Sequence, residues 1–525
     1  MYNENSQTPK GPYMSLNELQ EIISKKAFPL EWPGNFIANK WQACKGSTKT
    51  SSNNPNSGQK LIDISISKEV IQTALQASHQ SQNRISSIPL QERIEILKRF
   101  RQTVADYENL VESVLRLEAG KPQWEAQEDI KNALTYIDWI VENHETFFQN
   151  LLSPATCGHN KADFKLIPLG TTIGYLPFST PLSSFVNFFS ATVLAGCPLT
   201  IFTSSHAILS SMVFGKIVES IHAPDNILNI VFGNYNSFRI ALSDPEVAAV
   251  IYTGSVEHCD SIRKESGARK GRQHILQSGG KNAVIVHSSA DMELAINCVT
   301  YGALKSAGQR CTSTSRVFVY RDLLDEFNKK LVETFSKIKI GRTDLDGDDQ
   351  PFMGPLYSKK AVEKFLRFQT MANRESDKTL LWGKALENSD GGHFVRPGIH
   401  LLSNFDNNNA YQFNILFSPE VAIYPYEVLE DAIEKINTTD SAFAVSFVGE
   451  PSILEDRRGL FLAPNLMVNS PTVELETTLP LAGRLQSGHN RFHGPAICLY
   501  LCYPQALLDK NTSENSLSAW PWPKF

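Results

Sequence analysis

The sequence has few of the residue patterns that mark secreted, membrane-spanning or metal-binding proteins. Its 525 residues include only eight cysteines, and no two of them have CxxC spacing. A disulfide framework and a zinc site are therefore not expected, and reduced thiols fit a cytoplasmic protein. The first residues, MYNENSQTPKG, lack the basic start and apolar run of a signal peptide. The acidic run at 344–350 lacks the glutamate that a calcium loop needs at its twelfth position, so no metal site is predicted.

The chain also lacks an excess of positive charge. It has 50 lysines and arginines against 55 aspartates and glutamates, a formal net charge of -5. This balance argues against a nucleic-acid partner and against a polybasic membrane surface. Residues 166–205 carry no charge, but glycines and prolines interrupt them. A buried strand, helix and strand are expected there instead of a membrane span.

What the chain does have is a regular alternation of apolar strands and amphipathic helices. Strands are expected at 171–178, 199–204, 227–233, 248–255, 282–288 and 316–322. Helical patterns lie between most of them, so the sequence predicts an α/β protein with a parallel sheet covered on both faces. Apolar residues spaced by three and four predict one helix from Pro89 to Gly120. The stretch SLNE predicts a capping box between Ser15 and Glu18.

Three short segments contain residues suited to binding or catalysis. They are YTGS at 252–255, SGGKN at 278–282 and GQRCTS at 308–313. Turns after parallel strands can offer backbone N–H groups to a phosphate, and the thiol of Cys311 could act as a nucleophile. However, such turns are common, there is no GxGxxG, and most cysteines are buried and inert. Each segment alone leaves a purely structural role open.

Together these segments resemble the aldehyde dehydrogenase superfamily, over roughly residues 35 to 510. Three further segments occur in the family's order: LPFSTPL at 176–182, FSP at 417–419 and PLAGRLQSG at 480–488. The succinylglutamate-semialdehyde dehydrogenase branch is the most similar, because NSPT at 469–472 resembles its NKPT and SGHNRF at 487–492 its SGNHRP. The resemblance implies the aldehyde dehydrogenase-like fold.

For catalysis, the resemblance implies that Cys311 attacks an aldehyde. The family's general-base glutamate is replaced by Gln277 and its oxyanion-binding asparagine by Ser179. An amide cannot accept a proton from water, and general-base assistance is typically worth about 10²–10⁴ in rate. Loss of one oxyanion donor costs about 10²–10³. A reactive Cys311 is also expected to have its pKa lowered by nearby backbone donors.

For the cofactor, the resemblance implies NAD or NADP. The turn Thr253, Gly254 and Ser255 matches the family's cofactor turn FTGS, and Phe417 matches the phenylalanine of its ExFGP motif. The partner that the resemblance implies is a small-molecule aldehyde, and the sequence does not identify which one.

Other cofactor positions depart from the family pattern. Phe202 and Ser205 stand where the family's KPSE segment has a lysine and an acidic residue, and Ile415 replaces the glutamate of ExFGP. Cys259 replaces the glycine that follows the cofactor turn. Each change removes a group that contacts the dinucleotide or adds bulk beside it, so we expect its binding to be weak or lost.

The resemblance also implies the domain organisation. It predicts an N-terminal arm (1–31), a Rossmann-like cofactor domain in two segments (32–150 and 172–285) and a catalytic domain (286–475). It also predicts two oligomerisation strands (151–171 and 489–508) and a tail (511–525). The alternation in ICLYLCY at 497–503 favours a strand. A homodimer or homotetramer is expected.

Three functions stay open at this point. In the first, the chain is an NAD(P)+-dependent enzyme that oxidises an aldehyde such as succinylglutamate semialdehyde. Its activity would be weakened by Gln277, Ser179, Phe202 and Ile415. Alternatively it is an acylating or thioesterase-like variant, because a thiol acceptor does not need the missing base. Or it is a catalytically degenerate member that serves as an interaction or structural protein.

Overall fold

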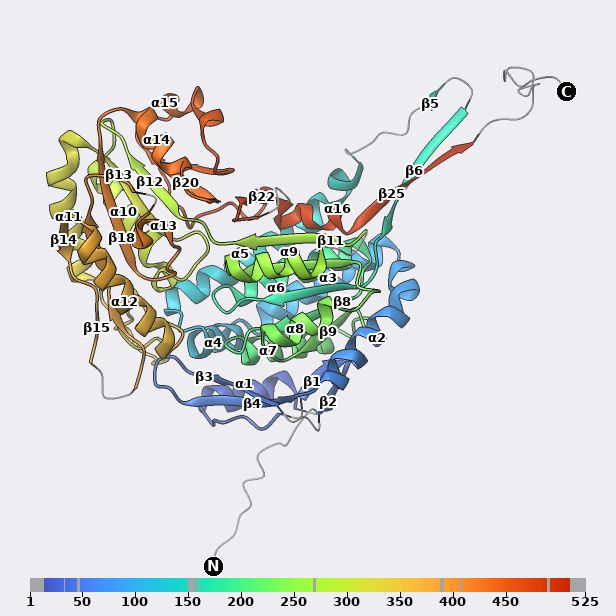
Figure 1. Cartoon of the computed structure of the whole chain (residues 1–525). Coiled ribbons are helices and arrows are strands. Elements are labelled where there is room, and N and C mark those ends of the chain that lie inside the picture. Colours follow the sequence, from blue (N-terminus) through green and yellow to red (C-terminus); the bar gives the residue numbers. More distant parts are fainter. Residues whose placement is uncertain are drawn as a thin grey trace, which may run out of the picture.

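The computed structural model describes residues 14–32, 34–44, 48–149, 156–157, 160–267, 271–387, 391–406, 408–488 and 492–509. Figure 1 shows two α/β lobes side by side and a narrow β-ribbon that projects from one of them. Within these ranges no helix is long and apolar enough to cross a membrane. The same part of the chain has no group of three or more His, Cys, Asp or Glu side chains that could hold a metal ion.

The first lobe contains a seven-stranded sheet in the order β11-β10-β7-β8-β9-β1-β2. Five strands are parallel, as predicted, and β1 and β2 pair antiparallel at one edge. The strands are β1 (Gly34–Ile37), β2 (Lys40–Ala43), β7 (Thr172–Leu176), β8 (Leu199–Thr203), β9 (Leu228–Val231), β10 (Ala249–Gly254) and β11 (Gln273–Ser278). From β7 the chain first builds β8 and β9 on one side and then crosses to place β10 on the other. The strand order therefore reverses between β7 and β10.

Helices cover both faces of this sheet. One face packs against α3 to α7, and the other against α2, α8 and α9. The bounds are α2 (Lys68–Ser86), α3 (Leu90–Asp106), α4 (Glu108–Glu118), α5 (Gln123–Gln149), α6 (Pro181–Ala195), α7 (Ile208–Ser220), α8 (Tyr235–Leu242) and α9 (Val256–Ser266). The uncharged stretch at 166–205 forms the end of β6, then β7, α6 and β8, which confirms the predicted strand, helix and strand.

Two helix predictions can be compared with the structure directly. The capping box is confirmed at α1 (Leu16–Ser24), where Ser15 Oγ accepts a hydrogen bond from the Glu18 N–H and the Glu18 carboxylate accepts one from the Ser15 N–H. The single helix predicted from Pro89 to Gly120 is wrong. The backbone at Tyr107 is non-helical, with φ −112° and ψ 29°, and separates α3 from α4. A continuous apolar periodicity cannot reveal such a break.

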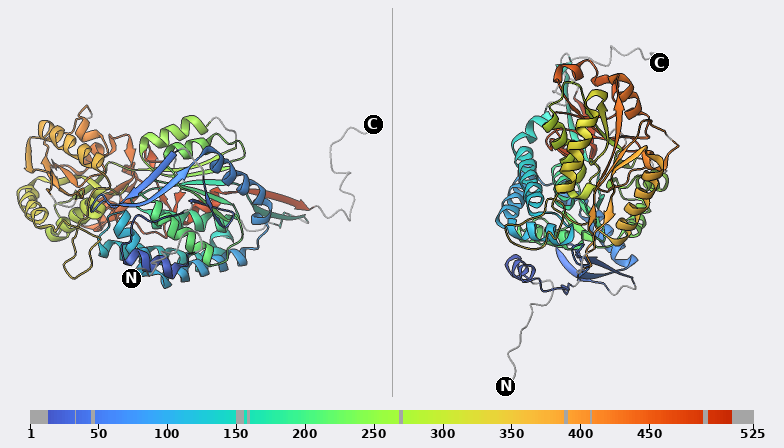
Figure 2. Two further views of the ribbon diagram at one scale, coloured as in Figure 1. Left: turned by 90° about the horizontal axis from the view of Figure 1, so that it is seen from below. Right: turned by 90° about the vertical axis from the view of Figure 1, so that its left-hand side faces the viewer.

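The second lobe contains another seven-stranded sheet, in the order β14-β17-β18-β13-β12-β20-β21. Its strands are β12 (Asn282–Val286), β13 (Thr314–Tyr320), β14 (Lys378–Leu381), β17 (Gly398–Leu401), β18 (Glu420–Tyr426), β20 (Ala444–Val448) and β21 (Asn465–Val468). Its longer helices are α10 (Met292–Leu304), α11 (Leu324–Lys337), α12 (Lys359–Glu375) and α14 (Leu429–Asn437). The left view of Figure 2 shows this lobe beside the first, and in the right view it faces the reader.

The projecting ribbon is formed by β6 (Asn160–Pro168) and β25 (Cys502–Asp509), with the short β5 (Thr156–Cys157) beside β6. β6 and β25 pair antiparallel from Cys502 opposite Pro168 to Asp509 opposite Lys161. The strand predicted over ICLYLCY is wrong in its first part. α16 (Ile497–Tyr500) is a short helix with Ile497 and Cys498 buried against α6, and the strand begins only at Cys502. A short apolar run does not distinguish the two structures.

Candidate active site at Cys311

The turn that carries Cys311 has an unusual backbone. It follows α10 and the short η1 (Lys305–Gly308), and it leads into β13. Ser306 and Ala307 have positive φ angles of 53° and 51°, and Gly308 has φ 70°. A Cβ atom at Gly308 would lie 2.4 Å from the Ser418 carbonyl oxygen, so only glycine fits. Non-glycine residues in this region cost about 1–3 kcal/mol each and persist only where the surroundings impose them.

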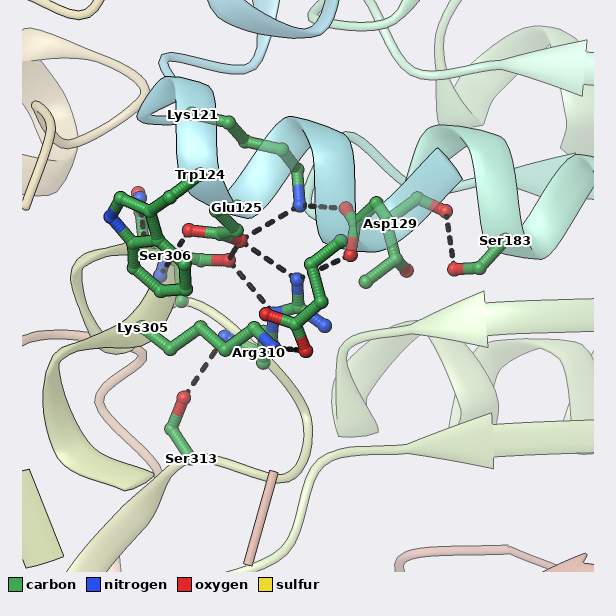
Figure 3. A network of polar contacts seen from close by, with 12 residues as sticks. Lys121, Trp124, Glu125, Asp129, Ser183, Lys305, Ser306, Arg310 and Ser313 are labelled. Carbon is green, nitrogen blue, oxygen red and sulfur yellow. Dashed lines mark hydrogen bonds and ion pairs between the residues drawn. The ribbon is translucent and has the colours of Figure 1, made fainter. Parts of the chain in front are cut away.

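A buried network of charges holds this turn in place (Figure 3). Arg310, next to the nucleophile candidate, places Nη2 2.7 Å from Glu125 Oε1 and 2.8 Å from Asp129 Oδ1 on α5. Lys121 Nζ lies 2.9 Å from Glu125 Oε1 and 2.5 Å from Asp129 Oδ2. The Ser306 N–H donates to Glu125 Oε2 at 2.9 Å. Two cations and two carboxylates therefore tie the strained turn to a helix of the other lobe.

Burial alone would raise the pKa of Glu125, but the nearby cations of Lys121 and Arg310 outweigh it and lower that pKa below its ordinary value. The carboxylate is thus charged and fully paired. We did not predict this network from the sequence. The four-residue spacing of Glu125 and Asp129 puts them on one side of α5, and Lys121 lies just before that helix, but nothing in the sequence links them to Arg310.

Gln277 and Cys311, predicted to share a site, do lie together. Gln277 is on β11, and its Nε2 atom is 3.7 Å from Cys311 Sγ. The Cys311 carbonyl accepts hydrogen bonds from the Gly280 N–H at 3.2 Å and from Asn282 Nδ2 at 2.9 Å. The SGGKN and GQRCTS segments are therefore joined directly.

The pKa of Cys311 differs from the prediction. Burial raises the pKa of this thiol to about 11, although the Arg310 cation, the Gln277 amide and the local backbone N–H groups all favour the thiolate. The expectation of a lowered pKa is wrong because these donors do not compensate for loss of water. The thiol is protonated at neutral pH.

Ser179 lies in the turn between β7 and α6 and is half-buried. The turn therefore sits at the carboxyl edge of the first sheet, where parallel sheets bind ligands. Next to it, the Phe178 ring packs on Tyr357 of the second lobe, with ring centroids 4.2 Å apart.

The turn Thr253, Gly254 and Ser255 joins β10 to α9. Thr253 is opposite Gln277 in the parallel pairing of β10 with β11, so this turn is adjacent to the strand that carries Gln277. Ser255 is the N-cap of α9, and its Oγ atom accepts from the His258 N–H at 3.3 Å. The Ser255 N–H donates to the Tyr252 hydroxyl at 3.2 Å.

Four further positions were predicted to contact a cofactor. Two of them lie at the SGGKN turn, which joins β11 to β12, and the other two lie in or just after β8 of the first sheet. Ile415 and Phe417 cover the SGGKN turn, since a Cβ on Gly279 would lie 2.6 Å from Phe417 Cζ and 3.6 Å from Ile415 Cγ2. Phe202 is fully buried within the first sheet's core, with its ring edge-on to Phe238 at 5.7 Å. Ser205, just after β8, is half-buried.

A profile of the aldehyde dehydrogenase family matches residues 41–506. The chain belongs to the aldehyde dehydrogenase family. Its six matching segments therefore reflect descent, and its fold is the aldehyde dehydrogenase fold.

Relatives of this aldehyde dehydrogenase family member differ in their substrates. Escherichia coli succinate-semialdehyde dehydrogenase [NADP(+)] is 25% identical over 419 residues, which are 78% of this chain and 84% of the relative. Serratia proteamaculans N-succinylglutamate 5-semialdehyde dehydrogenase is 23% identical over 501 residues, 94% and 99% of the two chains. The crystal structure of a Mycobacterium tuberculosis aldehyde dehydrogenase complexed with NAD+ superposes with a TM-score of 0.85 at 19% identity, over 91% of this chain and 98% of that one.

The residues present fit part of a dinucleotide. The Ser255 N–H at the start of the 11-residue helix α9 is a donor suited to a phosphate oxygen. Phe417 presents an aromatic ring beside the glycine turn. At Phe202 and Ile415, by contrast, apolar side chains offer nothing to a ribose hydroxyl. These residues therefore offer a backbone donor suited to a phosphate, and no polar side-chain group at Phe202 or Ile415.

Proposed function

We propose that this chain oxidises a small aldehyde with NAD+ or NADP+ through covalent capture of the substrate by Cys311, and that it does so slowly. The observation that carries the proposal is the strained turn of Cys311, which the ion pairs of Arg310 with Glu125 and Asp129 hold in place. A charged network of this kind is costly to bury, and here it fixes the backbone that leads into the thiol.

In the proposed reaction, Cys311 Sγ forms a bond to the aldehyde carbon and the carbonyl oxygen becomes an oxyanion. The backbone N–H of Cys311 and the hydroxyl of Ser179 would donate hydrogen bonds to that oxygen. Because the pKa of Cys311 is about 11, the thiolate is a small fraction of the protein at neutral pH. We therefore expect capture of the aldehyde to be slow.

NAD+ or NADP+, when bound, would supply the hydride acceptor that this oxidation needs, and the acyl group would remain on Cys311 Sγ. Ser255 would hold a phosphate through its N–H, and Phe417 would line the nicotinamide side. A hydrogen bond to a charged group contributes about 1.5–3 kcal/mol. Loss of such contacts at Phe202 and Ile415 therefore weakens binding by about 10²–10⁴ if the two effects add.

Release of the acyl group is the other slow step. Gln277 reaches Cys311 Sγ with an amide nitrogen, which donates and cannot take a proton from the attacking water. This observation supports a second candidate, an acylating enzyme in which a small thiol accepts the acyl group. Attack by a thiolate does not need a base at Gln277.

The substrate we propose is an aldehyde that also bears a carboxylate. Support comes from two relatives, a succinate-semialdehyde dehydrogenase and an N-succinylglutamate 5-semialdehyde dehydrogenase, whereas two others are dehydrogenases of lactaldehyde and hydroxyisobutyraldehyde. All four are between 23% and 28% identical to this chain, so the substrate class is proposed and the individual compound is left to the assay.

The test is the formation of NADH or NADPH with a panel of such aldehydes, with and without a small thiol. We expect slow formation by the wild type and none by Cys311→Ala. Cys298→Ala, at a buried cysteine on α10, serves as the control and should behave as the wild type. Equal rates in the wild type and Cys311→Ala would rule out the proposal. Stimulation by the thiol would favour the acylating candidate over hydrolysis.

A further inference from the structure

The topology of the first sheet identifies where a ligand would bind. The strand order reverses between β7 and β10, and open parallel sheets bind ligands beyond the carboxyl ends of strands at such a point. β10 ends there in the turn before α9, and α8 begins nearby, after β9. Helices α8 and α9 lie in contact on the same face of the sheet.

The backbone N–H of Ser255, the donor at this turn, already forms a hydrogen bond with a side chain of the protein. The Tyr252 hydroxyl accepts the hydrogen bond of the Ser255 N–H at 3.2 Å. A Cβ atom at Gly254 would lie 2.2 Å from the same hydroxyl oxygen, so the tyrosine fills the space that the glycine leaves. An N–H group at a helix N-terminus is the donor that a phosphate oxygen would use. The Tyr252 hydroxyl therefore lies where a phosphate oxygen bound to the Ser255 N–H would lie.

The hydroxyl is held there from its other side. It lies 3.0 Å from His258 Nδ1, and burial lowers the pKa of His258, so its neutral ring can accept the hydroxyl proton. The His258 ring stacks on Tyr235 of α8 with centroids 3.5 Å apart and planes 9° apart. The Tyr252 ring stacks on Tyr175 of β7 at 5.5 Å. Aromatic contacts thus connect β7, β10, α8 and α9 across the point where the strand order reverses.

We propose that the Tyr252 hydroxyl is an internal competitor for the dinucleotide, and that the cofactor binds only when this hydroxyl leaves the Ser255 N–H. The inference rests on the proposed function, because it concerns the same cofactor site. It adds that Tyr252 lowers the affinity for the dinucleotide further than the lost contacts at Phe202 and Ile415 do by themselves.

The variant Tyr252→Phe tests this directly. It keeps the ring, and the family's FTGS turn carries phenylalanine at this position, so the fold should be preserved. Tyr235→Phe is the matched control, because it removes a hydroxyl from the same cluster that donates instead to the His258 carbonyl at 3.1 Å. Calorimetric titration with ADP, NAD+ and NADP+ measures binding without any turnover.

We expect Tyr252→Phe to bind ADP and NAD+ about three- to tenfold more tightly than the wild type, the value of one neutral hydrogen bond. Tyr235→Phe should bind like the wild type. If Tyr252→Phe melts at a lower temperature, His258→Leu provides a second test, because it removes the group that anchors the hydroxyl and should also strengthen binding.

The outcomes separate this inference from the proposed function. Equal affinity of wild type and Tyr252→Phe overturns the inference and leaves the proposed function standing. No binding by either protein at millimolar ligand overturns both, since opening the turn then creates no site. Tighter binding by Tyr252→Phe without aldehyde oxidation by any variant supports the inference and overturns the proposed function.

Discussion

The side-chain amide of Gln277 points its Nε2 atom at the sulfur of Cys311, 3.7 Å away. A donor thus faces the nucleophile candidate at the position where the family motif implies a base. The contact favours the thiolate, yet burial outweighs it and keeps the pKa of Cys311 at about 11. In the proposed reaction, an amide in place of a base would therefore slow release of the acyl group.

Replacing the amide with a carboxylate should speed that release. Gln277→Glu is expected to raise the rate of acyl-group hydrolysis by about 10²–10⁴, because it supplies a group that can take a proton from water. The measurement is steady-state turnover after a burst. Gln273→Glu, on the same strand but at its start, is the control and should change nothing. A Gln277→Glu enzyme as slow as the wild type would show that water attack is not limiting.

The reactivity of Cys311 should depend steeply on pH. Only the thiolate reacts with iodoacetamide, and with a pKa of about 11 the thiolate fraction increases with pH throughout the neutral and mildly alkaline range. The alkylation rate should rise about tenfold per pH unit from pH 7 to pH 10. Labelling of Cys311 is followed by peptide mass spectrometry, with Cys311→Ala as the blank. A plateau already at pH 8 would contradict the raised pKa.

The buried network should contribute strongly to stability. Glu125→Gln leaves Lys121 and Arg310 short of one negative charge, and breaking a buried pair costs about 3–5 kcal/mol in the free energy of unfolding. Because the folded-state pKa of Glu125 is lowered, the stabilisation is complete above the ordinary value of 4.5 and is lost as the pH falls below it.

Urea unfolding at pH 7 and at pH 4 measures this effect. The difference between wild type and Glu125→Gln should be large at pH 7 and smaller at pH 4. Glu326→Gln, which breaks the exposed pair with Lys330 on α11, is the control and should leave the midpoint unchanged. A difference that grows on acidification would contradict the assigned pKa direction.

The projecting ribbon should mediate assembly into a homodimer or homotetramer. β25 is an edge strand, and its Leu507 and Tyr503 are 63% and 45% exposed. Exposed apolar edge strands pair readily with other chains. Analytical ultracentrifugation should show an oligomer for the wild type and a shift towards monomer for Leu507→Glu. Leu460→Glu, at an exposed leucine of the other lobe, should keep the wild-type state. A monomeric wild type would contradict this prediction.

Much of the fold followed from local sequence patterns. The strands from 171 to 322 were predicted because buried parallel strands are short apolar runs between helices. The break at Tyr107 and the helix at Ile497–Tyr500 were missed, because tertiary packing decides them and the apolar pattern is the same in either conformation.

The site was predictable only where residue type and order define it. The motifs brought Gln277 and Cys311 together correctly. They could not indicate that Arg310 pairs with Glu125 and Asp129, because those residues are about 180 positions apart and meet only when the lobes pack. Nor could they show that Tyr252 folds back onto Ser255, since a tyrosine and a phenylalanine fit the same strand position equally well.

The most direct test of the central claim is the mass of the intact protein after incubation with a carboxylate-bearing aldehyde and millimolar NAD+ or NADP+. We expect a stable acyl adduct on Cys311 that requires the dinucleotide, is absent from Cys311→Ala and disappears faster in Gln277→Glu. Unmodified wild-type protein across the whole aldehyde panel would contradict the account, and would assign this member of the family a role without aldehyde chemistry.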